Sequence, residues 1–352
     1  MAVRINEFDR LNDGRIVHKI TLSNQDGSQV SLLTLGASLQ SWVFAGKDIV
    51  LGFDKAENYF SSGAYIGATV GRVCNRTADG RFKLNGQTYQ LICNEPDRRV
   101  HLHGGSVGFD KKIWDYEVIQ DGTEPCVAFT AVSADGEEGY PGNLTLKVTY
   151  SLSTDNELSL DYCVITDADT PLNMTNHSYF NLNGCDGATI QNNILCIHAD
   201  EYTPVTERLI PTGEYASVNN TAIDFRAGKP IGDALDNEDD TMIYTGGIDH
   251  NFVLSKEKMA LREVANAYSP VTGIQLTCYT DLPGIQVYTG NFLNESGGKY
   301  GLCWGPHQGF CLETQYFANS INEPNFPSIV LKAGETYRSQ TVYAVDMIKK
   351  EG

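Results

Sequence analysis

The sequence lacks several features that would point to particular classes of protein. Its nine cysteines form no C-x-x-C pair, which argues against a cysteine zinc site. No apolar run approaches the roughly 18 residues that a membrane-spanning helix needs. Lysine and arginine total 26 against 44 aspartates and glutamates, and the net charge of −18 disfavours nucleic acid and anionic membranes as partners. A neutral ligand is compatible with this charge.

A secretory signal is also missing from the sequence. The N-terminal residues carry charges through Arg10 and contain no apolar segment of the kind that a signal peptide has. The cysteines lie mostly in apolar runs, as Cys93 and Cys196 do, which is typical of free buried thiols in a reducing compartment. We therefore expect a cytoplasmic protein.

Helical signals are few, and short apolar-rich runs separated by turns dominate the chain. Residues 256–267 contain good helix formers with poor apolar spacing, and we interpret them as a strand or a short helix. Several runs alternate apolar and polar residues around turn sequences such as Asn85-Gly86, which is the pattern of β-hairpins. The strands expected on this basis are residues 16–22, 29–35, 36–44, 81–84, 87–91, 114–120, 126–132, 144–152, 157–166, 261–268, 273–279 and 342–347.

This pattern predicts an all-β protein, because short strands with turns about every ten residues are typical of sandwiches. The sequence contains no linker or change of composition that would divide it, so we expect a single domain over residues 1–352. The acidic run at residues 233–240 has the composition of a solvated surface loop.

Glu313 lies in the short apolar stretch 309–315 (G-F-C-L-E-T-Q), which is predicted to be a strand. A carboxylate buried there would have a raised pKa, which suits a general base near neutral pH. The alternative is an exposed glutamate on the polar face of a half-buried strand, and most glutamates are exposed.

Two of the seven histidines, His101 and His103, are separated by one residue and would share a face of a strand. Such a pair could bind a metal, but the sequence offers no further ligands, so no metal site is predicted. His103 is followed by two glycines, and we interpret it as a side chain on a loop that a ligand can approach closely.

His177 lies in the stretch 173–184, in which polar and aromatic side chains are mixed. Polar groups could bind sugar hydroxyls and aromatic rings could cover the apolar face of a sugar. The alternative is a core histidine held by its asparagine and serine neighbours.

Three more polar residues lie next to glycine-containing segments. Arg76 could present a fixed fork of donors to ligand oxygens, or it could form a structural ion pair. Asp249 could bind a ligand at the start of a strand, or serve as a turn residue. Gln286 could contact a ligand, or point outward from a strand.

Taken in order, these stretches resemble the galactose mutarotase (aldose 1-epimerase) family. The resemblance runs from about residue 15 to the C-terminus and rests on six ordered motifs, with a further match at 322–327. The motifs are 71–76 (G-R-V-C-N-R), 102–109 (L-H-G-G-S-V-G-F), 173–184 (N-M-T-N-H-S-Y-F-N-L-N-G), 249–252 (D-H-N-F), 283–293 (P-G-I-Q-V-Y-T-G-N-F-L) and 311–315 (C-L-E-T-Q).

The resemblance implies a large antiparallel β-supersandwich and an isomerase that interconverts the α and β anomers of free aldoses such as D-galactose and D-glucose. It implies no cofactor and no metal. The matching positions make Glu313 the base and His177 the acid, with His103 assisting proton transfer and binding the sugar. The other matching sugar-binding positions are Arg76, Asn75, Asp249 and Gln286.

The implied mechanism is ring opening and closing. Glu313 takes the proton of the C1 hydroxyl while protonated His177 gives one to the ring oxygen O5. The opened chain rotates about C1–C2, and the roles reverse on closing. We expect mutual attraction to hold the pair as a carboxylate and an imidazolium.

The sequence departs from the family pattern in three places. Residues 94–100 are about two residues longer than expected, Leu282 stands where a polar residue is common, and Cys74 replaces a common alanine. The longer loop and Leu282 leave the preferred sugar open.

Three alternative functions remain on the sequence alone. A hexose-6-phosphate epimerase would need a cluster of arginines or lysines, and basic residues near the motifs are sparse. A sugar sensor would have lost catalysis, although Glu313 and His177 are intact. A glycoside hydrolase could use Asp249 and Glu313 as its carboxylate pair. The expected partner is a small monosaccharide, and the protein is expected to be a monomer or homodimer.

Overall fold

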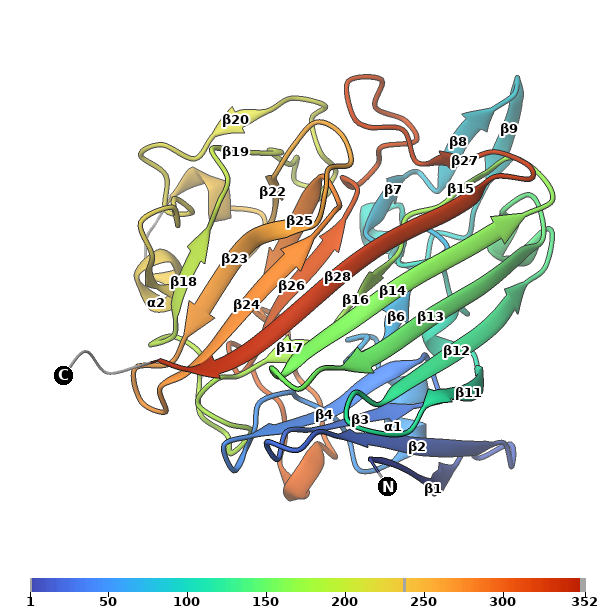
Figure 1. Ribbon diagram of the computed structural model, residues 1–352. Helices are drawn as coiled ribbons and strands as arrows, with labels where there is room; N and C mark the ends of the chain where they lie inside the picture. Colours follow the sequence, from blue (N-terminus) through green and yellow to red (C-terminus); the bar gives the residue numbers. More distant parts are fainter. Residues whose placement is uncertain (1, 237–238, 349–352) are drawn as a thin grey trace.

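The computed structural model describes residues 2–236 and 239–348, and within them most of the chain forms antiparallel strands (Figure 1). The largest sheet has nine strands, and the C-terminal strand β28 lies between β14 and β24. In sheet order the strands are β11 (Asp115–Gln120), β12 (Cys126–Ser133), β13 (Leu144–Leu152), β14 (Glu157–Thr166), β28 (Thr336–Met347), β24 (Ile274–Thr280), β23 (Arg262–Tyr268), β18 (Ile194–Ile197) and β21 (Lys229–Pro230).

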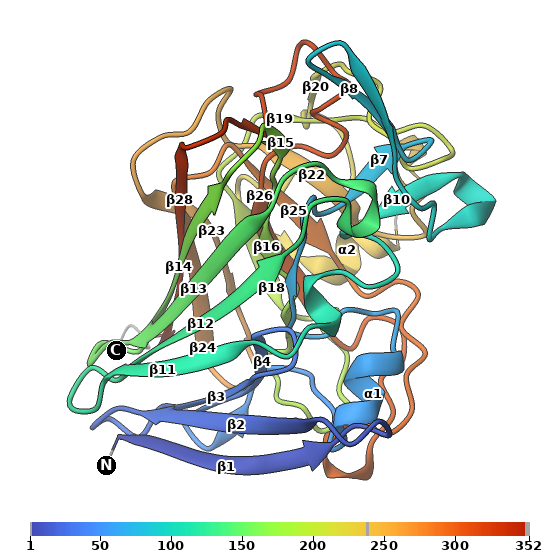
Figure 2. The same ribbon diagram turned by 90° about the vertical axis from the view of Figure 1, so that its right-hand side faces the viewer.

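Two further sheets complete the main layers. The six-stranded sheet has the order β17 (Tyr179–Phe180), β26 (Phe310–Gln315), β25 (Gly284–Tyr288), β22 (Asp249–Val253), β19 (Glu201–Tyr202) and β20 (Ala216–Ser217). The five-stranded sheet has the order β1 (Val3–Arg10), β2 (Ile16–Ser23), β3 (Gln29–Leu33), β4 (Ser38–Phe44) and β5 (Lys47–Asp48). Figure 2 shows the five-stranded sheet next to the β11 edge of the largest sheet.

Short two-stranded ribbons and helical turns connect these layers. The ribbons are β6 (Thr69–Val70) with β16 (Thr175–Asn176), β7 (Arg76–Ala78) with β10 (Val100–Leu102), β8 (Arg81–Leu84) with β9 (Gln87–Gln90), and β15 (Thr170–Pro171) with β27 (Val330–Leu331). The α-helices are α1 (Ala56–Ser61) and α2 (Ile231–Leu235), and the 3₁₀ turns are η1 (Pro96–Arg98), η2 (Phe109–Lys111), η3 (Glu137–Gly139), η4 (Asp240–Met242) and η5 (Lys299–Gly301). In the described ranges, none of the helices has the length and apolar character needed to cross a bilayer.

Alternation along the strands explains where the core lies. In β13 and β14 buried residues recur at every second position, so one face of the largest sheet is apolar. That face packs on the six-stranded sheet, where the hydroxyl of Tyr343 donates to the carbonyl of Leu312 at 2.7 Å. A single cluster of buried side chains includes Val30 of β3, Leu146 of β13 and Leu312 of β26. The three main sheets therefore share one core.

The all-β prediction is confirmed, and so is the antiparallel supersandwich that the resemblance implied. The hairpin at Asn85-Gly86 and the pairing of residues 144–152 with 157–166 appear as expected. The last strand begins at Thr336 rather than at residue 342. Of residues 256–267, the part from Arg262 onward forms strand β23.

The acidic run at residues 233–240 was predicted to be a loop, but its first residues belong to helix α2. Ile231 and Ala234 of this helix are buried in the main core, and this apolar contact is what fixes the helix. Residues 237 and 238 of the run lie outside the described residues.

Candidate active site

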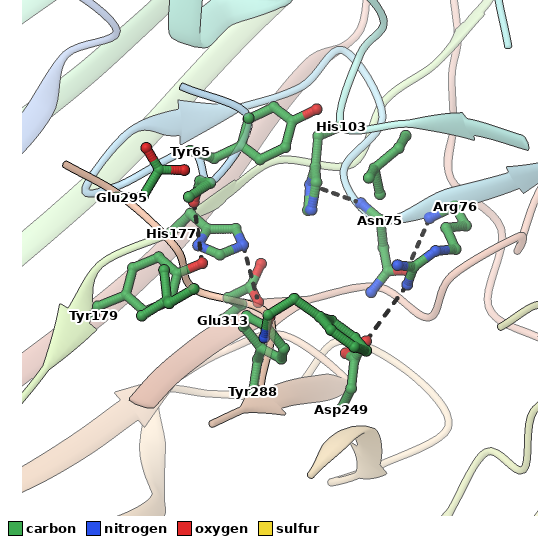
Figure 3. A pocket seen from close by; sticks show the side chains of 15 residues that line it. Tyr65, Asn75, Arg76, His103, His177, Tyr179, Asp249, Tyr288, Glu295 and Glu313 are labelled. Atoms are coloured by element: carbon green, nitrogen blue, oxygen red, sulfur yellow. Dashed lines mark hydrogen bonds and ion pairs between the residues drawn. The ribbon is translucent and has the colours of Figure 1, made fainter. Parts of the chain in front are cut away.

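A pocket of about 220 Å³ opens where the six-stranded sheet is covered by the segments around β7 and β10 (Figure 3). Its wall contains six of the seven residues that the sequence analysis assigned to the site. The lining residues are Gly63, Ala64, Tyr65, Asn75, Arg76, Leu102, His103, His177, Tyr179, Asp249, Tyr288, Phe292, Leu293, Glu295 and Glu313.

Strand register brings the floor of the pocket together. Tyr179, Cys311, Tyr288 and Asp249 are successive cross-strand partners across β17, β26, β25 and β22. Glu313 lies two residues beyond Cys311, so its side chain points to the same face of the sheet. The pairing thus gathers groups that are far apart in the sequence on one surface.

The opposite wall comes from β7 and β10. Leu102 pairs with Arg76 across these strands, which places His103 beside Asn75. Asn75, His103 and the neighbouring Tyr65 all have positive φ, at 58°, 52° and 53°. Such backbone conformations cost free energy in non-glycine residues and concentrate at functional sites.

The two glycines after His103 serve the protein's own packing rather than the approach of a ligand. A Cβ added at Gly104 would lie 1.7 Å from the carbonyl oxygen of Gly71. Only a residue without a side chain permits this contact. Gly104 is thus required by its contact with the segment that leads into Asn75, while His103 itself lines the pocket, where a ligand could approach it.

Glu313 is buried at the bottom of the pocket, with 2% of its side chain exposed. Its Oε1 lies 3.7 Å from Nε2 of His177, and its Oε2 has no hydrogen-bond partner among the described residues. The alternative of an exposed strand glutamate is thus excluded. Since buried polar groups normally have partners, a buried oxygen without one at the end of a pocket is available to a ligand.

His177 is enclosed by aromatic side chains and a thiol. Its ring centroid lies 5.1 Å from that of Tyr179, 5.9 Å from that of Tyr65 and 6.4 Å from that of Tyr288. Its Nδ1 lies 3.6 Å from Sγ of Cys311. These contacts hold the ring so that Nε2 faces Glu313.

Burial changes the proton affinities of both groups. It lowers the pKa of His177 to about 4. Burial, followed by the negative charge of Asp249, raises the pKa of Glu313 well above its usual value, and Arg76 only partly opposes this. The expected carboxylate and imidazolium pair is therefore not favoured in the unliganded pocket, because desolvation acts against both charges. Desolvation favours a protonated carboxyl on Glu313 beside a neutral imidazole on His177.

His103 presents a hydrogen-bond donor to the pocket. The backbone N–H of Asn75 donates to its Nδ1 at 3.1 Å, and burial lowers its pKa well below the usual value. A neutral imidazole whose Nδ1 accepts a hydrogen bond carries its proton on Nε2.

The same hydrogen bond bears on metal binding. Ligand atoms of His103, His177 and Glu313 lie within 4.8 Å of one another, a grouping that could hold a cation. A metal needs the lone pair of Nε2 of His103, where the neutral ring carries its proton. The grouping therefore suits a polar ligand better than a metal. His101 does not join it, because its ring is bonded to Tyr140 and to the carbonyl of Ile92.

Arg76 and Asp249 form the side of the pocket. NH1 of Arg76 lies 3.6 Å from Oδ2 of Asp249, and Nε donates to Glu95 at 2.9 Å. The amide of Gln286 donates to Oδ1 of Asp249 at 2.6 Å. Gln286 itself does not line the pocket. Its hydrogen bond holds the carboxylate of Asp249 in place.

Sequence reasoning missed the aromatic and acidic residues that complete the wall. Tyr65, Tyr288, Phe292 and Glu295 line the pocket, and Glu95 lies behind Arg76. No spacing rule singles them out. A signal was present for Tyr288 and Phe292, because both lie within the stretch 283–293. Tyr288 also follows Gln286 on the same face of the strand.

Other predicted ligand contacts are structural. In the stretch 173–184 only His177 and Tyr179 reach the pocket. Asn176 and Asn181 donate to backbone carbonyls instead. Leu282, considered as a determinant of sugar preference, is fully buried in the core and does not line the pocket.

Comparison with known proteins identifies relatives over most of the chain. The family model described as aldose 1-epimerase matches residues 18–344. Galactose mutarotase from Bos taurus is 46% identical over 297 residues, covering 84% of this chain and 82% of that protein. Aldose 1-epimerase from Escherichia coli (strain K12) is 37% identical over 339 residues, covering 94% of this chain and 96% of its own.

A solved structure agrees. The crystal structure of galactose 1-epimerase from Lactobacillus acidophilus NCFM superposes with a TM-score of 0.87 at 30% identity, covering 98% of each chain. The family model spans most of the sequence, and both relatives exceed 30% identity over most of their length. This chain belongs to the aldose 1-epimerase family.

Proposed function

We propose that this protein is an aldose 1-epimerase (mutarotase) that interconverts the α and β anomers of free hexoses such as D-galactose and D-glucose by general acid/base ring opening and closing. The observation that carries the proposal is the placement of Glu313 and His177, 3.7 Å apart at the bottom of one pocket in a member of this family. Two groups so close can reach the C1 hydroxyl and O5 of one pyranose.

In the proposed mechanism Glu313 and His177 share one proton. Burial raises the pKa of the carboxyl and lowers that of the imidazole, so without a sugar the proton is held by Glu313. Sugar hydroxyls that donate to Glu313 stabilise its charged form and shift the proton to His177. Glu313 then takes the C1 hydroxyl proton, and His177 protonates O5.

The remaining residues hold the sugar during the ring-opened stage. Nε2–H of His103 donates to a sugar oxygen near the reacting centre and assists proton transfer. Arg76, Asn75 and Asp249 bind hydroxyls, and Gln286 supports this binding through its hydrogen bond to Asp249. Retaining the open chain matters because a rotated aldehyde must close in the same pocket.

The charge of the pocket favours an unphosphorylated sugar. Within the described residues, Arg76 is the one lysine or arginine that lines the pocket, and two carboxylates already engage it. A phosphate would need several unengaged cations. The proposed substrate is therefore a neutral monosaccharide, with no cofactor.

The domain organisation, cellular location and oligomeric state are further parts of this proposal. We infer that residues 1–352 act as one domain, since a shared core joins the main sheets. We place the protein in the cytoplasm, because it has nine free cysteines. The pocket is complete within one chain, so a monomer suffices for activity, and a homodimer is compatible.

Polarimetry tests the function directly. Purified protein added to freshly dissolved α-D-galactose or α-D-glucose should accelerate the approach to the equilibrium rotation. An unchanged spontaneous rate for both sugars would contradict the assignment. A comparison with glucose 6-phosphate separates this function from that of a sugar-phosphate epimerase, and sugar binding by calorimetry without acceleration would indicate a sensor.

A further inference from the structure

A chain of alternating charges runs from the protein surface to the side of the pocket. Arg98 contacts Oε1 of Glu95, Oε2 of Glu95 accepts from Nε of Arg76, and NH1 of Arg76 faces Asp249. The side chains become less exposed along this path, from 32% at Arg98 through 19% and 13% to 11% at Asp249. This series of charged side chains thus links the rim of the pocket to the residues proposed to bind the sugar.

The longer loop at residues 94–100 delivers Glu95 to this position. The backbones of Glu95 and Val100 form two mutual hydrogen bonds at 3.2 Å, which close the loop at its base. Asn94 fixes the next turn by bonding both the N–H and the carbonyl of Leu102. Arg99 takes a left-handed conformation with φ of 53°. The place of Glu95 is therefore set by backbone geometry.

The loop also gathers positive charge at the rim. Arg208 donates to the carbonyls of Arg98 and Arg99 at 2.8 and 2.9 Å and to Asp79 at 2.8 Å. Arg99 lies 3.6 Å from the same carboxylate. Four arginines, including Arg76, thus surround one wall, although basic residues near the motifs are sparse in the sequence.

Without Glu95, this wall would attract anions. Arg76 would then keep Asp249 as its carboxylate partner, and Arg98 would lose the carboxylate it contacts. A planar guanidinium fork is well suited to carboxylate and phosphate groups. With Glu95 present, each of its oxygens occupies one guanidinium. Among Arg98, Glu95, Arg76 and Asp249 the charges balance, so both guanidiniums of this set already have a carboxylate partner.

We propose that Glu95 makes the pocket selective for uncharged sugars by neutralising Arg76, and that its removal turns the same wall into a site for sugar acids. This inference rests on the proposed mutarotase function and adds a residue that sets specificity. Glu95 does not line the pocket, so it acts through Arg76 as a positioning residue.

The test compares two substrates that differ only at C6, α-D-galactose and α-D-galacturonate. We measure kcat/KM for each by polarimetry and take the ratio of galacturonate to galactose. Glu95→Gln keeps the shape and removes the charge, and we expect the ratio to rise by about tenfold, as for a unit charge removed several ångströms from the substrate carboxylate.

Two further variants distinguish charge from a general disturbance of the loop. Arg98→Gln removes one positive charge and leaves this wall with a net negative charge. It should therefore lower the ratio of galacturonate to galactose. The double variant Glu95→Gln with Arg98→Gln restores neutrality and should return the ratio toward that of the wild type. Asp97→Asn is the matched control, because it removes an exposed carboxylate from the same loop and should leave the ratio unchanged.

The outcomes separate this inference from the function on which it rests. If the ratio stays within twofold in Glu95→Gln, or rises equally in Asp97→Asn, Glu95 does not set specificity, while accelerated galactose mutarotation by the wild type still supports the enzyme. If Glu95→Gln does not fold, the response of Arg98→Gln alone decides, and an unchanged or higher ratio overturns the proposal. Failure of the wild type on galactose removes both.

Discussion

Asp48 and Glu313 are both buried carboxylates, but the protein surrounds them differently. Asp48 accepts from Nζ of Lys299 at 2.6 Å, from Tyr300 and Ser41 at 2.8 Å, and from the backbone of Trp42. Glu313 has the imidazole of His177 near it, at 3.7 Å, and its Oε2 has no hydrogen-bond partner in the described part of the chain.

The two carboxylates therefore differ in role, because one stabilises the structure and the other can exchange a proton. A buried charge with a full set of partners fixes the structure around it, and here Lys299 is tied to β4 through the carbonyl of Gln40 and to β5 through Asp48. A buried carboxyl without partners costs stability and remains free to exchange a proton with a ligand. Incomplete solvation, rather than burial alone, therefore marks the functional carboxylate.

The largest expected effect is on catalysis, from Glu313→Gln. The variant keeps the side-chain shape but cannot take a proton, so we expect kcat for galactose mutarotation to fall by about 10²–10⁴-fold. Polarimetry on fresh α-D-galactose measures this. Asp48→Asn should retain the wild-type rate per folded molecule, and equal losses in the two variants would abolish the distinction between the two carboxylates.

The second expected effect is on stability, from Asp48→Asn. Removing this charge leaves the buried ammonium of Lys299 uncompensated, and we expect a loss of about 3–5 kcal/mol in the free energy of unfolding. Urea denaturation measures the change. Asp186→Asn removes only the exposed pair with Lys47 and serves as the control, with a change within about 0.5 kcal/mol. A loss of similar size in Glu313→Gln would contradict the comparison.

The third effect is a pH dependence that belongs to Glu313. Its pKa in the folded protein lies above the unfolded value, so the unfolded chain releases this proton first as pH rises. The stability of the wild type relative to Glu313→Gln is therefore greatest below pH ~4.5 and declines as pH rises toward the folded pKa. Denaturation curves of both proteins from acid to alkaline pH give the slope. Parallel curves would show that burial does not perturb this carboxyl.

The smallest expected effect is on substrate binding, from Gln286→Leu. It tests whether Gln286 only positions Asp249 or takes part in the reaction itself. Gln286→Leu removes the amide that donates to Asp249, a hydrogen bond to a charged group worth about 1.5–3 kcal/mol. Because Gln286 lies outside the pocket lining, we expect KM for galactose to rise about tenfold while kcat stays within about threefold. Steady-state polarimetry gives both constants. A kcat loss as large as that of Glu313→Gln would place Gln286 in the proton-transfer step itself.

The sequence was sufficient to predict most of the strands, because alternation and turn residues are local signals. The hairpins around Asn85-Gly86 and Asn156 needed no information from distant parts of the chain. Helix α2 was missed because its acidic surface dominates the composition, whereas two buried apolar residues determine the fold there.

The site was predicted through ordered motifs and not through physical signals of single residues. Nothing local distinguishes Arg76, which faces the pocket, from Arg72, which is buried among backbone carbonyls and whose pKa burial lowers to about 10. The pairing of Asp48 with Lys299 spans 251 positions. Glu95 acquires its place from loop closure. Such long-range contacts appear only once the chain is folded.

The position of strand β28 in the largest sheet has a consequence for how the protein is made. This strand joins β14 to β24, yet the ribosome synthesises it after every other strand of that sheet. Until then the two halves of the sheet each present an open edge, and such edges invite pairing with other nascent chains. Residues 336–347 are therefore needed to join the two halves of this sheet, and a chain that stops shortly before them would leave both edges open to chaperones and proteases.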